Sequence, residues 1–160
     1  MEIKITDVNY NDNKQARELV YLLNAYASDP MGGGQPLDKY VTENLASELS
    51  KLPHAFSVIC YVNNQPAGLI NCFEAFSTFS CKPLVNIHDV MVLKEYRGNS
   101  LSQKLLERVE EIASTKGCCK LTLEVLSENE IAKLSYKKYG FSRYELDPTK
   151  GNAQFWQKLI

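Results

Sequence analysis

Residues 86–92 read NIHDVMV, residues 93–102 read LKEYRGNSLS, and an amphipathic helical pattern follows at once. The first segment belongs to an apolar run that is typical of a buried strand. The second is a loop of small and polar residues that opens into the helix. A loop in this position presents unpaired backbone N–H groups and the positive end of the helix dipole to an anion. The stretch predicts a site for a pyrophosphate, although simple N-capping by Ser100 or Ser102 would explain the same residues.

The residues before this stretch predict a strand, two helices and a hairpin. The first strand alternates charged and apolar residues, and both helices show apolar residues at helical spacing. The hairpin follows from the turn signal Asn63-Asn64-Gln65 between two apolar runs. Strands are expected at residues 2–8, 56–62, 66–73 and 84–93, and helices along residues 16–27 and 37–52.

The residues after it predict a strand-helix-strand unit and two closing strands. The expected elements are a helix along residues 101–112 that stops before Gly117, a strand at residues 120–126, a helix opened by the capping-box pattern Ser127-x-x-Glu130, and strands at residues 141–146 and 153–159. A strand-helix-strand connection implies a parallel pair, whereas hairpins are antiparallel. The sequence therefore predicts one α/β domain over residues 1–160, with a mixed, mostly antiparallel central sheet flanked by helices.

The composition excludes several classes of protein. With 160 residues, 44% hydrophobic and 23% charged, the chain has the size and make-up of one globular domain. A net charge of −1 gives no general attraction to nucleic acid or to an acidic membrane. No apolar run approaches the roughly 20 residues that span a bilayer, and the first residues are unlike a signal peptide. We therefore expect a cytoplasmic protein that binds neither nucleic acid nor membrane.

Metal binding is not expected either. The five cysteines form no Cys-x-x-Cys pair, their number is odd, and only two histidines accompany them. Zinc sites and disulfide frameworks need regular spacing of such residues. Reduced cysteines that pack as small hydrophobic residues are the better interpretation.

The loop after the strand resembles a known motif. Tyr96-Arg97-Gly98-Asn99-Ser100-Leu101-Ser102 is similar to the pyrophosphate loop of the GNAT superfamily of N-acetyltransferases, whose pattern is Arg/Gln-x-x-Gly-x-Gly/Ala. Arg97 matches the first position, whereas Ser100 and Ser102 stand where glycines are usual, so their side chains intrude where backbone should approach phosphate. The resemblance implies that CoA is bound by the loop residues Arg97, Gly98, Asn99, Ser100, Leu101 and Ser102.

A second segment resembles the same family. Asn129-x-x-Ala132-x-x-x-Tyr136-x-x-x-Gly140-Phe141 is similar to the family segment Asn-x-x-Ala…Tyr-x-x-x-Gly-Phe, and it follows the loop in the expected order. Residues 129, 132 and 136 would share one face of a helix. Alone, Tyr136 would read as a core tyrosine with its hydroxyl at the surface. Together with the loop, the resemblance implies that Asn129 binds the cofactor and that Tyr136 protonates the leaving thiolate of CoA.

The resemblance implies a complete reaction. A GNAT-like sheet splays between its fourth and fifth strands, and the pantetheine arm of acetyl-CoA lies in that cleft, bonded to the backbone of Met91 and Val92 as a further strand would be. A primary amine of a small molecule or peptide then attacks the thioester directly in a ternary complex. Acetyl-CoA is the co-substrate, no metal takes part, and a homodimer is the assembly that the family suggests. The sequence does not identify the acceptor.

His88 is the candidate base for the acceptor ammonium. Strand alternation places residues 86, 88, 90 and 92 on one face and Asp89 on the other. Several GNAT enzymes carry a catalytic Glu or His on the former face, and imidazole titrates in the suitable range. A histidine in a purely structural role, hydrogen-bonded to backbone, is an equal alternative. Asp89 is interpreted as structural.

Two further segments are candidates for the acceptor pocket. One is the glycine-rich segment 29–34, and the other is the aromatic and hydroxyl-rich segment 74–81. For any single residue of either segment, an ordinary loop or core position is the preferred interpretation. The triple glycine follows no strand, so it is not a phosphate-binding fingerprint.

A second class of function stays open beside the enzyme. It is a non-catalytic acyl-CoA-binding sensor or protein-interaction module of the same fold. The serines at 100 and 102 favour this alternative, whereas Tyr136 and His88 favour catalysis. A nucleotide-binding α/β protein is disfavoured, because no Gly-x-Gly-x-x-Gly or Walker pattern follows a strand.

Overall fold

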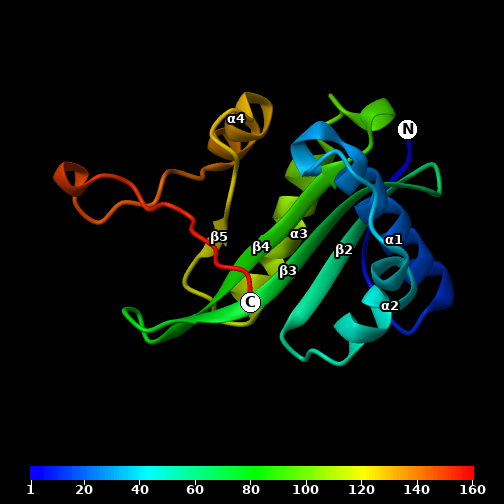
Figure 1. Cartoon of the computed structure of the whole chain (residues 1–160), viewed down its shortest axis with the longest axis horizontal. Helices are drawn as coiled ribbons and strands as arrows, with labels where there is room; N and C mark the ends of the chain where they lie inside the picture. The colour runs from blue at the N-terminus through cyan, green and yellow to red at the C-terminus, as the bar shows by residue number, and fades with distance from the viewer. The chain divides into compact units, whose positions relative to one another are not determined.

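The computed structural model describes all 160 residues of the sequence (Figure 1). The chain divides into two compact units, Met1–Leu123 and Glu124–Ile160. The first unit holds every strand and the helices α1, α2 and α3, whereas the second holds α4. None of these helices has both the length and the apolar character needed to cross a bilayer.

The first unit is built on a five-stranded sheet. The strands lie side by side in chain order, and all neighbours are antiparallel except the last pair, which is parallel. Their bounds are Ile3–Asp7 (β1), Ala55–Val62 (β2), Gln65–Ser77 (β3), Lys82–Val92 (β4) and Leu121–Leu123 (β5). The predicted mixed, mostly antiparallel sheet is confirmed, although β5 is shorter than the segment 120–126 expected for it.

Strands β4 and β5 pair over only part of β4. Their register begins with Val85 opposite Leu121 and ends with Ile87 opposite Leu123. Residues 88–92 of β4 therefore keep an unpaired edge on the β5 side. The splay expected between the fourth and fifth strands corresponds to this unpaired edge.

Helices cover both faces of the sheet. α1 (Asn13–Ser28) and α2 (Lys39–Ser50) lie on one face, and α3 (Leu101–Thr115) lies on the other (Figure 1). On the first face, apolar side chains of both helices and of the sheet form one core cluster: Leu19, Leu22, Leu49, Ile59, Tyr61, Leu69, Met91 and Leu93. On the second, Gly68 allows α3 to approach closely, because a Cβ there would lie 3.2 Å from Leu105 Cδ1.

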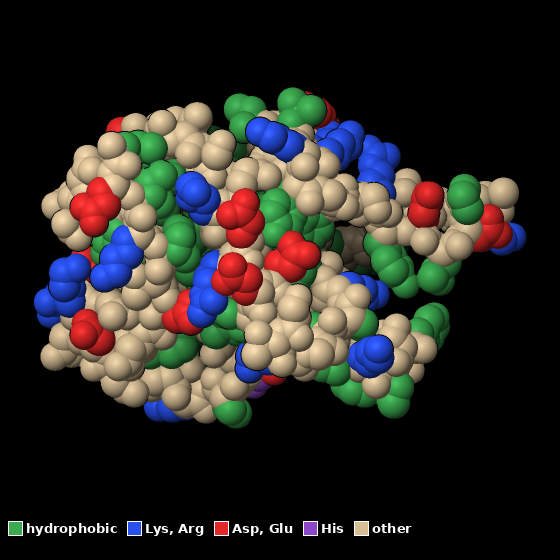
Figure 2. Space-filling view, turned by 180° about the vertical axis from the view of Figure 1, so that it is seen from behind, with side chains coloured by type: hydrophobic (Ala, Val, Ile, Leu, Met, Phe, Trp, Pro, Cys, Tyr) green, Lys and Arg blue, Asp and Glu red, His purple; other side chains and the backbone are tan.

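Charged side chains are mixed over the surface. Acidic and basic groups lie side by side on the face seen in Figure 2. Ion pairs along α2, Lys39 with Glu43 and Lys51 with Glu48, follow the spacing of neighbouring helical positions. This distribution agrees with the net charge of −1.

A β-bulge interrupts β4 where it pairs with β3. Asn71 lies opposite Asp89, and the next residue of β3, Cys72, lies opposite Ile87. His88 is therefore the extra residue of the bulge. The alternation of side chains shifts by one position beyond it.

The bulge changes which β4 side chains share a face. The ring of His88 packs edge-on against Phe73, with ring centroids 5.4 Å apart, and Phe73 packs against the core cluster under α1. Met91, two residues beyond Asp89, belongs to the same cluster. His88 and Asp89 therefore point to the α1 side together. The expectation that residues 86, 88, 90 and 92 share one face, opposite Asp89, is wrong because simple alternation does not hold through a bulge.

The second unit begins with a loop and α4 (Glu130–Tyr139). Asn129 is the N-cap, because its Oδ1 accepts a hydrogen bond from the backbone N–H of Ala132 at 3.2 Å. The capping box predicted from Ser127 and Glu130 is therefore wrong. Asparagine is itself a preferred N-cap, and it starts the helix two residues later than the box would.

The closing strands predicted at residues 141–146 and 153–159 are absent, so that prediction is also wrong. Alternating apolar residues indicated strands, but a strand also needs a neighbour for its N–H and C=O groups. A backbone hydrogen bond from Ala153 to Tyr144, at 3.2 Å, links the two segments without forming a ladder. The alternation of apolar residues does not show whether a neighbouring strand is present, and neither segment has one.

Candidate functional site

The loop between β4 and α3 has the backbone of an anion site. After β4 ends at Val92, the 3₁₀ helix η2 (Lys94–Tyr96) leads to Gly98 and Ser100, which have φ of 83° and 58°. Ser100 is the N-cap of α3, but its side chain makes no capping hydrogen bond. Simple N-capping by Ser100 therefore does not explain the motif, and the first turn of α3 keeps its preference for an anion.

The remaining loop residues have distinct surroundings. Asn99 Nδ2 donates to the Tyr96 carbonyl oxygen at 3.0 Å and so stabilises the turn. The side chain of Leu101 is buried in the core, so only its backbone is available to a ligand. Ser102 lies in the first turn of α3.

Arg97 joins this loop to the end of α1. Its Nε donates to the Val92 carbonyl oxygen at 3.0 Å, and its Nη2 donates to Asp29 Oδ2 at 3.1 Å. Lys94 Nζ lies 4.0 Å from the same carboxylate oxygen. Hydrogen bonds from the Met31 N–H and then from Arg97 hold the pKa of Asp29 below its usual value, so this carboxylate is ionised at neutral pH. A pyrophosphate that takes Arg97 must compete with Asp29 for the guanidinium.

A cavity of about 230 Å³ lies between the end of α1 and the segment that ends β4. Its lining residues are Ala25, Tyr26, Ser28, Asp29, Met91, Val92, Leu93, Lys94, Glu95 and Arg97. Three of the predicted cofactor-binding residues thus meet at one cavity: Met91, Val92 and Arg97. Its volume lies below the roughly 300–1,000 Å³ usual for whole ligands, so it suits the reacting end of a ligand.

The glycine-rich segment 29–34 is a compact turn beside this cavity. The side chain of Asp29 caps the short 3₁₀ helix η1 (Pro30–Gly32). A Cβ on Gly32 would lie 2.0 Å from the Tyr26 carbonyl oxygen, so only glycine fits there. This candidate for the acceptor pocket is therefore a hydrogen-bonded turn, and its first residue, Asp29, lines the cavity.

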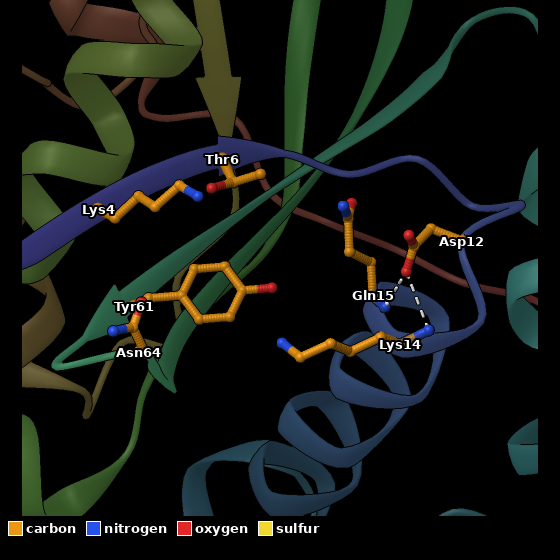
Figure 3. A pocket seen from close by; sticks show the side chains of 7 residues that line it. All are labelled: Lys4, Thr6, Asp12, Lys14, Gln15, Tyr61 and Asn64. Atoms are coloured by element: carbon orange, nitrogen blue, oxygen red, sulfur yellow. Dashed lines mark hydrogen bonds between the residues drawn. The ribbon is translucent and has the colours of Figure 1, made fainter.

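A second cavity, of about 320 Å³, lies on the same face of the sheet at the start of α1 (Figure 3). It is lined by Lys4, Thr6, Asp12, Lys14, Gln15, Tyr61 and Asn64. Figure 3 shows the hydroxyl of Tyr61 directed toward α1. That hydroxyl donates to Glu18 Oε2 at 2.6 Å, and Lys14 Nζ pairs with Glu18 Oε1 at 2.6 Å.

Tyr61 and Lys14 thus both bind Glu18 of α1, and Asp12 caps α1. None of the predicted site residues lines this cavity, and segment 74–81 lines neither cavity. That segment forms the end of β3 and the turn into β4, where Phe76 and Phe79 are exposed. The first cavity is therefore the candidate site.

The side chains of His88 and Asp89 on β4 point toward α1. Both residues shortly precede Met91 and Val92, which line the first cavity. His88 is exposed, whereas Asp89 is half-buried and its Oδ2 accepts a hydrogen bond from Asn71 Nδ2 at 2.9 Å. Burial, followed by the charges of Asp89 and Asp29, raises the pKa of Tyr26. The charge of Asp89 therefore influences a side chain of α1, which agrees with its position on the α1 face of the sheet. An acidic residue inside an apolar strand was the available signal, but alternation without the bulge assigns it to the wrong face.

Asn129 and Tyr136, the remaining predicted site residues, lie at the start and on the body of α4 in the second unit. The side chain of Asn129 caps the helix, so the asparagine of the motif has a local structural role. The ring of Tyr136 packs edge-on against Phe141, with centroids 5.9 Å apart. The helical spacing predicted for residues 129, 132 and 136 is present.

Comparison with known proteins places the chain in a family. The sequence model of the "Acetyltransferase (GNAT) family" matches residues 16–141, most of the chain. The protein therefore belongs to the GNAT family of acetyltransferases, as the loop and the α4 segment indicated.

Individual relatives share parts of the sequence. Thialysine N-epsilon-acetyltransferase of Bos taurus is 39% identical over 68 residues, which cover 42% of this chain and 39% of that protein. Glucosamine 6-phosphate N-acetyltransferase of Arabidopsis thaliana is 29% identical over 98 residues, which cover 58% of this chain and 64% of that protein. The matched region thus spans less than two thirds of the length of either relative.

Solved structures share the fold over nearly the whole chain. An aminoglycoside acetyltransferase, meta-AAC0020, from an uncultured soil metagenomic sample superimposes with a TM-score of 0.77 at 19% identity, covering 99% of this chain and 97% of that one. AAC(6')-Iy in complex with a CoA bisubstrate analog gives a TM-score of 0.77 at 17% identity, covering 100% of both chains. At these identities the likeness establishes the fold.

Proposed function

We propose that this protein is an acetyl-CoA-dependent N-acetyltransferase that acts on a primary amine. The observation that carries the proposal is the end of β4. There, an unpaired strand edge leads into a loop with Gly98 and Ser100 in left-handed conformations and into a helix without a side-chain cap at Ser100. A strand edge suits a pantetheine amide chain, and a helix start suits a pyrophosphate.

The donor would bind along this edge. The pantetheine arm would hydrogen-bond the backbone of Met91 and Val92, and its thioester would reach the cavity that these residues line. The pyrophosphate would lie on the loop from Arg97 to Ser102. By resemblance, Asn129 completes the cofactor site.

The chemistry is a direct transfer. The acceptor ammonium loses a proton to His88, the neutral amine attacks the thioester carbonyl, the C–N bond forms and the C–S bond breaks. By resemblance, Tyr136 supplies the proton that the leaving thiolate takes up. A thiol is a good leaving group, with a pKa of about 8.5, so a neutral phenol suffices as the acid.

The relatives support a cationic amine as acceptor. Their names give thialysine, glucosamine 6-phosphate and aminoglycosides, all of which are amines. The cavity is lined by the ionised Asp29. We therefore propose a small-molecule or peptide amine that is protonated at neutral pH.

Release of free thiol from acetyl-CoA tests this function. Thialysine, glucosamine 6-phosphate, the aminoglycoside sisomicin and a peptide with a free amino terminus form the acceptor panel. At least one should give acceptor-dependent release, and Tyr136→Phe should lower its rate while acetyl-CoA affinity stays unchanged. Acetyl-CoA binding without release across the panel would favour a non-catalytic acyl-CoA sensor instead.

A further inference from the structure

A row of polar side chains crosses the sheet on its α1 face. Ser57 of β2 lies opposite Asn71 of β3, and Asn71 lies opposite Asp89 of β4. Ser57 is 2% exposed and Asn71 is 4% exposed. Buried polar residues cost stability unless each finds a partner, so an unbroken row of them needs an explanation.

Hydrogen bonds in the row have one direction. Asp89 Oδ2 accepts from Asn71 Nδ2 at 2.9 Å, and Asn71 Oδ1 accepts from Ser57 Oγ at 2.6 Å. Since the Ser57 hydroxyl has a single proton and donates it to Asn71, the Tyr10 hydroxyl, 2.8 Å away, must donate to Ser57 Oγ. Every donor in the row thus points toward the Asp89 carboxylate.

Tyr10 is the first donor of the row, and its surroundings keep its hydroxyl protonated. Burial raises the pKa of Tyr10, so its hydroxyl keeps its proton and remains a donor through neutral pH. A chain of aligned hydrogen bonds polarises each member in the same sense. The row therefore fixes one oxygen of Asp89 and orients the carboxylate.

The other oxygen of Asp89 is left for a ligand. Asp89 is half-buried, its Oδ1 has no hydrogen bond to another protein group, and no Lys or Arg forms an ion pair with it. A carboxylate oxygen that has no partner in the protein can accept a hydrogen bond from a cationic ligand. Asp89 also shares its face with Met91, about 6.6 Å further along the strand, and Met91 lines the cavity at the end of α1.

We propose that Asp89 binds the ammonium group of the acceptor, and that Tyr10, Ser57 and Asn71 are positioning residues that orient its carboxylate. The proposal rests on the proposed acetyl transfer and adds the group that selects a cationic amine. The ammonium is held by Asp89 in the ground state. It then gives its proton to the neighbouring His88 before attack, so charge and protons balance.

Binding of the acceptor in the presence of CoA tests this without turnover. Thialysine, glucosamine 6-phosphate and sisomicin are titrated calorimetrically into the full chain loaded with CoA. Asp89→Asn keeps an acceptor for Asn71 but removes the charge, and should weaken amine binding about tenfold or more, as expected for a charged hydrogen bond. Glu107→Gln, an exposed acid on α3, is the matched control and should change nothing.

The positioning role is tested by a double-mutant cycle. Ser57→Ala and Tyr10→Phe should each weaken amine binding about threefold while CoA affinity stays unchanged. In the Asp89→Asn background, Ser57→Ala should cause no further loss, because Ser57 acts only through that charge. Tyr10→Phe keeps the ring and is the variant that preserves the fold; thermal unfolding checks each protein.

The outcomes separate this proposal from the proposed function. If amine binding depends on Asp89 but no thiol is released in the acceptor assay, the role of Asp89 in amine binding is supported and the proposed acetyl transfer is rejected. If turnover occurs and Asp89→Asn leaves the amine affinity unchanged, the role of Asp89 is rejected and the proposed acetyl transfer is supported. Equal losses from Ser57→Ala in both backgrounds would assign the row a structural role only. If none of the three amines binds, the proposed role of Asp89 in amine binding is rejected.

Discussion

Ser100 occupies a backbone conformation that favours glycine. Its φ of 58° and ψ of 22° lie in the left-handed region, where a side chain costs about 1–2 kcal/mol. The family motif has glycine at this position, and the structure shows why. The serine departs from the motif in side chain, yet it keeps the backbone shape that the loop requires.

Replacing Ser100 by glycine should relieve this strain. We expect Ser100→Gly to raise the free energy of unfolding by about 1 kcal/mol, with acetyl-CoA affinity unchanged or tighter. Ser102→Gly is the control, because Ser102 is helical; it should lower stability by roughly 0.5 kcal/mol without weakening affinity. Denaturant unfolding and calorimetry measure both quantities. A clear loss of affinity in Ser100→Gly would show that the hydroxyl contacts phosphate.

His88 is the proposed base, and its exposed ring beside Phe73 is open to solvent and to a ligand. His88→Ala should lower kcat/KM about 10²-fold or more, because it removes the group that takes the proton from the acceptor. His88→Gln should lower it equally, because an amide accepts no proton from an ammonium. A wild-type rate in His88→Gln would make the residue a positioning group.

Among the elements, β1 depends on a contact made across the sequence. It is an edge strand that pairs only with β2. Arg108 of α3 binds its last residue through two hydrogen bonds, Nε to Asp7 Oδ1 at 2.9 Å and Nη2 to Asp7 Oδ2 at 2.7 Å. This two-point contact fastens the edge strand to the helix beneath the sheet.

The contact should make stability depend on pH. Hydrogen bonding from Arg108 lowers the pKa of Asp7, so its contribution is present at neutral pH and is lost as pH falls through the lowered value. Both side chains are partly exposed, at 52% and 38%, so Asp7→Asn should cost only about 0.5–1 kcal/mol at pH 7. The difference from wild type should shrink toward pH 3 in urea unfolding. Glu111→Gln, which removes an ion pair within α3, should cost less, and a difference independent of pH would contradict this account.

At the scale of the whole molecule, ligand binding and folding are linked. A ligand that binds only the folded chain stabilises it by about 2.7 kcal/mol at 100 times its Kd. Acetyl-CoA should therefore raise the melting temperature, and Arg97→Glu should abolish that shift by placing a negative charge on the pyrophosphate loop. Arg108→Gln is the control: it should melt earlier but keep the full shift. If millimolar acetyl-CoA leaves the melting temperature of the wild type unchanged, the proposal that acetyl-CoA is the co-substrate is contradicted.

The sequence by itself determined the elements whose signals are local. Periodicity predicted α1, α2 and α3, because an amphipathic helix repeats its apolar residues within a few positions. Apolar runs and alternation also predicted all five strands of the sheet, although β5 is shorter than its expected segment. The hairpins and the strand-helix-strand unit predicted the mixed topology. The loop at residues 96–102 and the segment from Asn129 to Phe141 resembled a family whose model then matched.

Only the tertiary structure decided what depends on distant partners. The bulge at His88 arises from how β3 and β4 pair, and it brings Asp89 beside Asn71, 18 positions away in the chain. Asp29 meets Arg97 across 68 positions, which no periodicity predicts. The prediction of closing strands was wrong for the same reason, because alternation indicates the two faces of a strand but not which strand pairs with it. Local propensity acts over a few residues, whereas register, ion pairs and ladders are set by groups that meet only after the chain has folded.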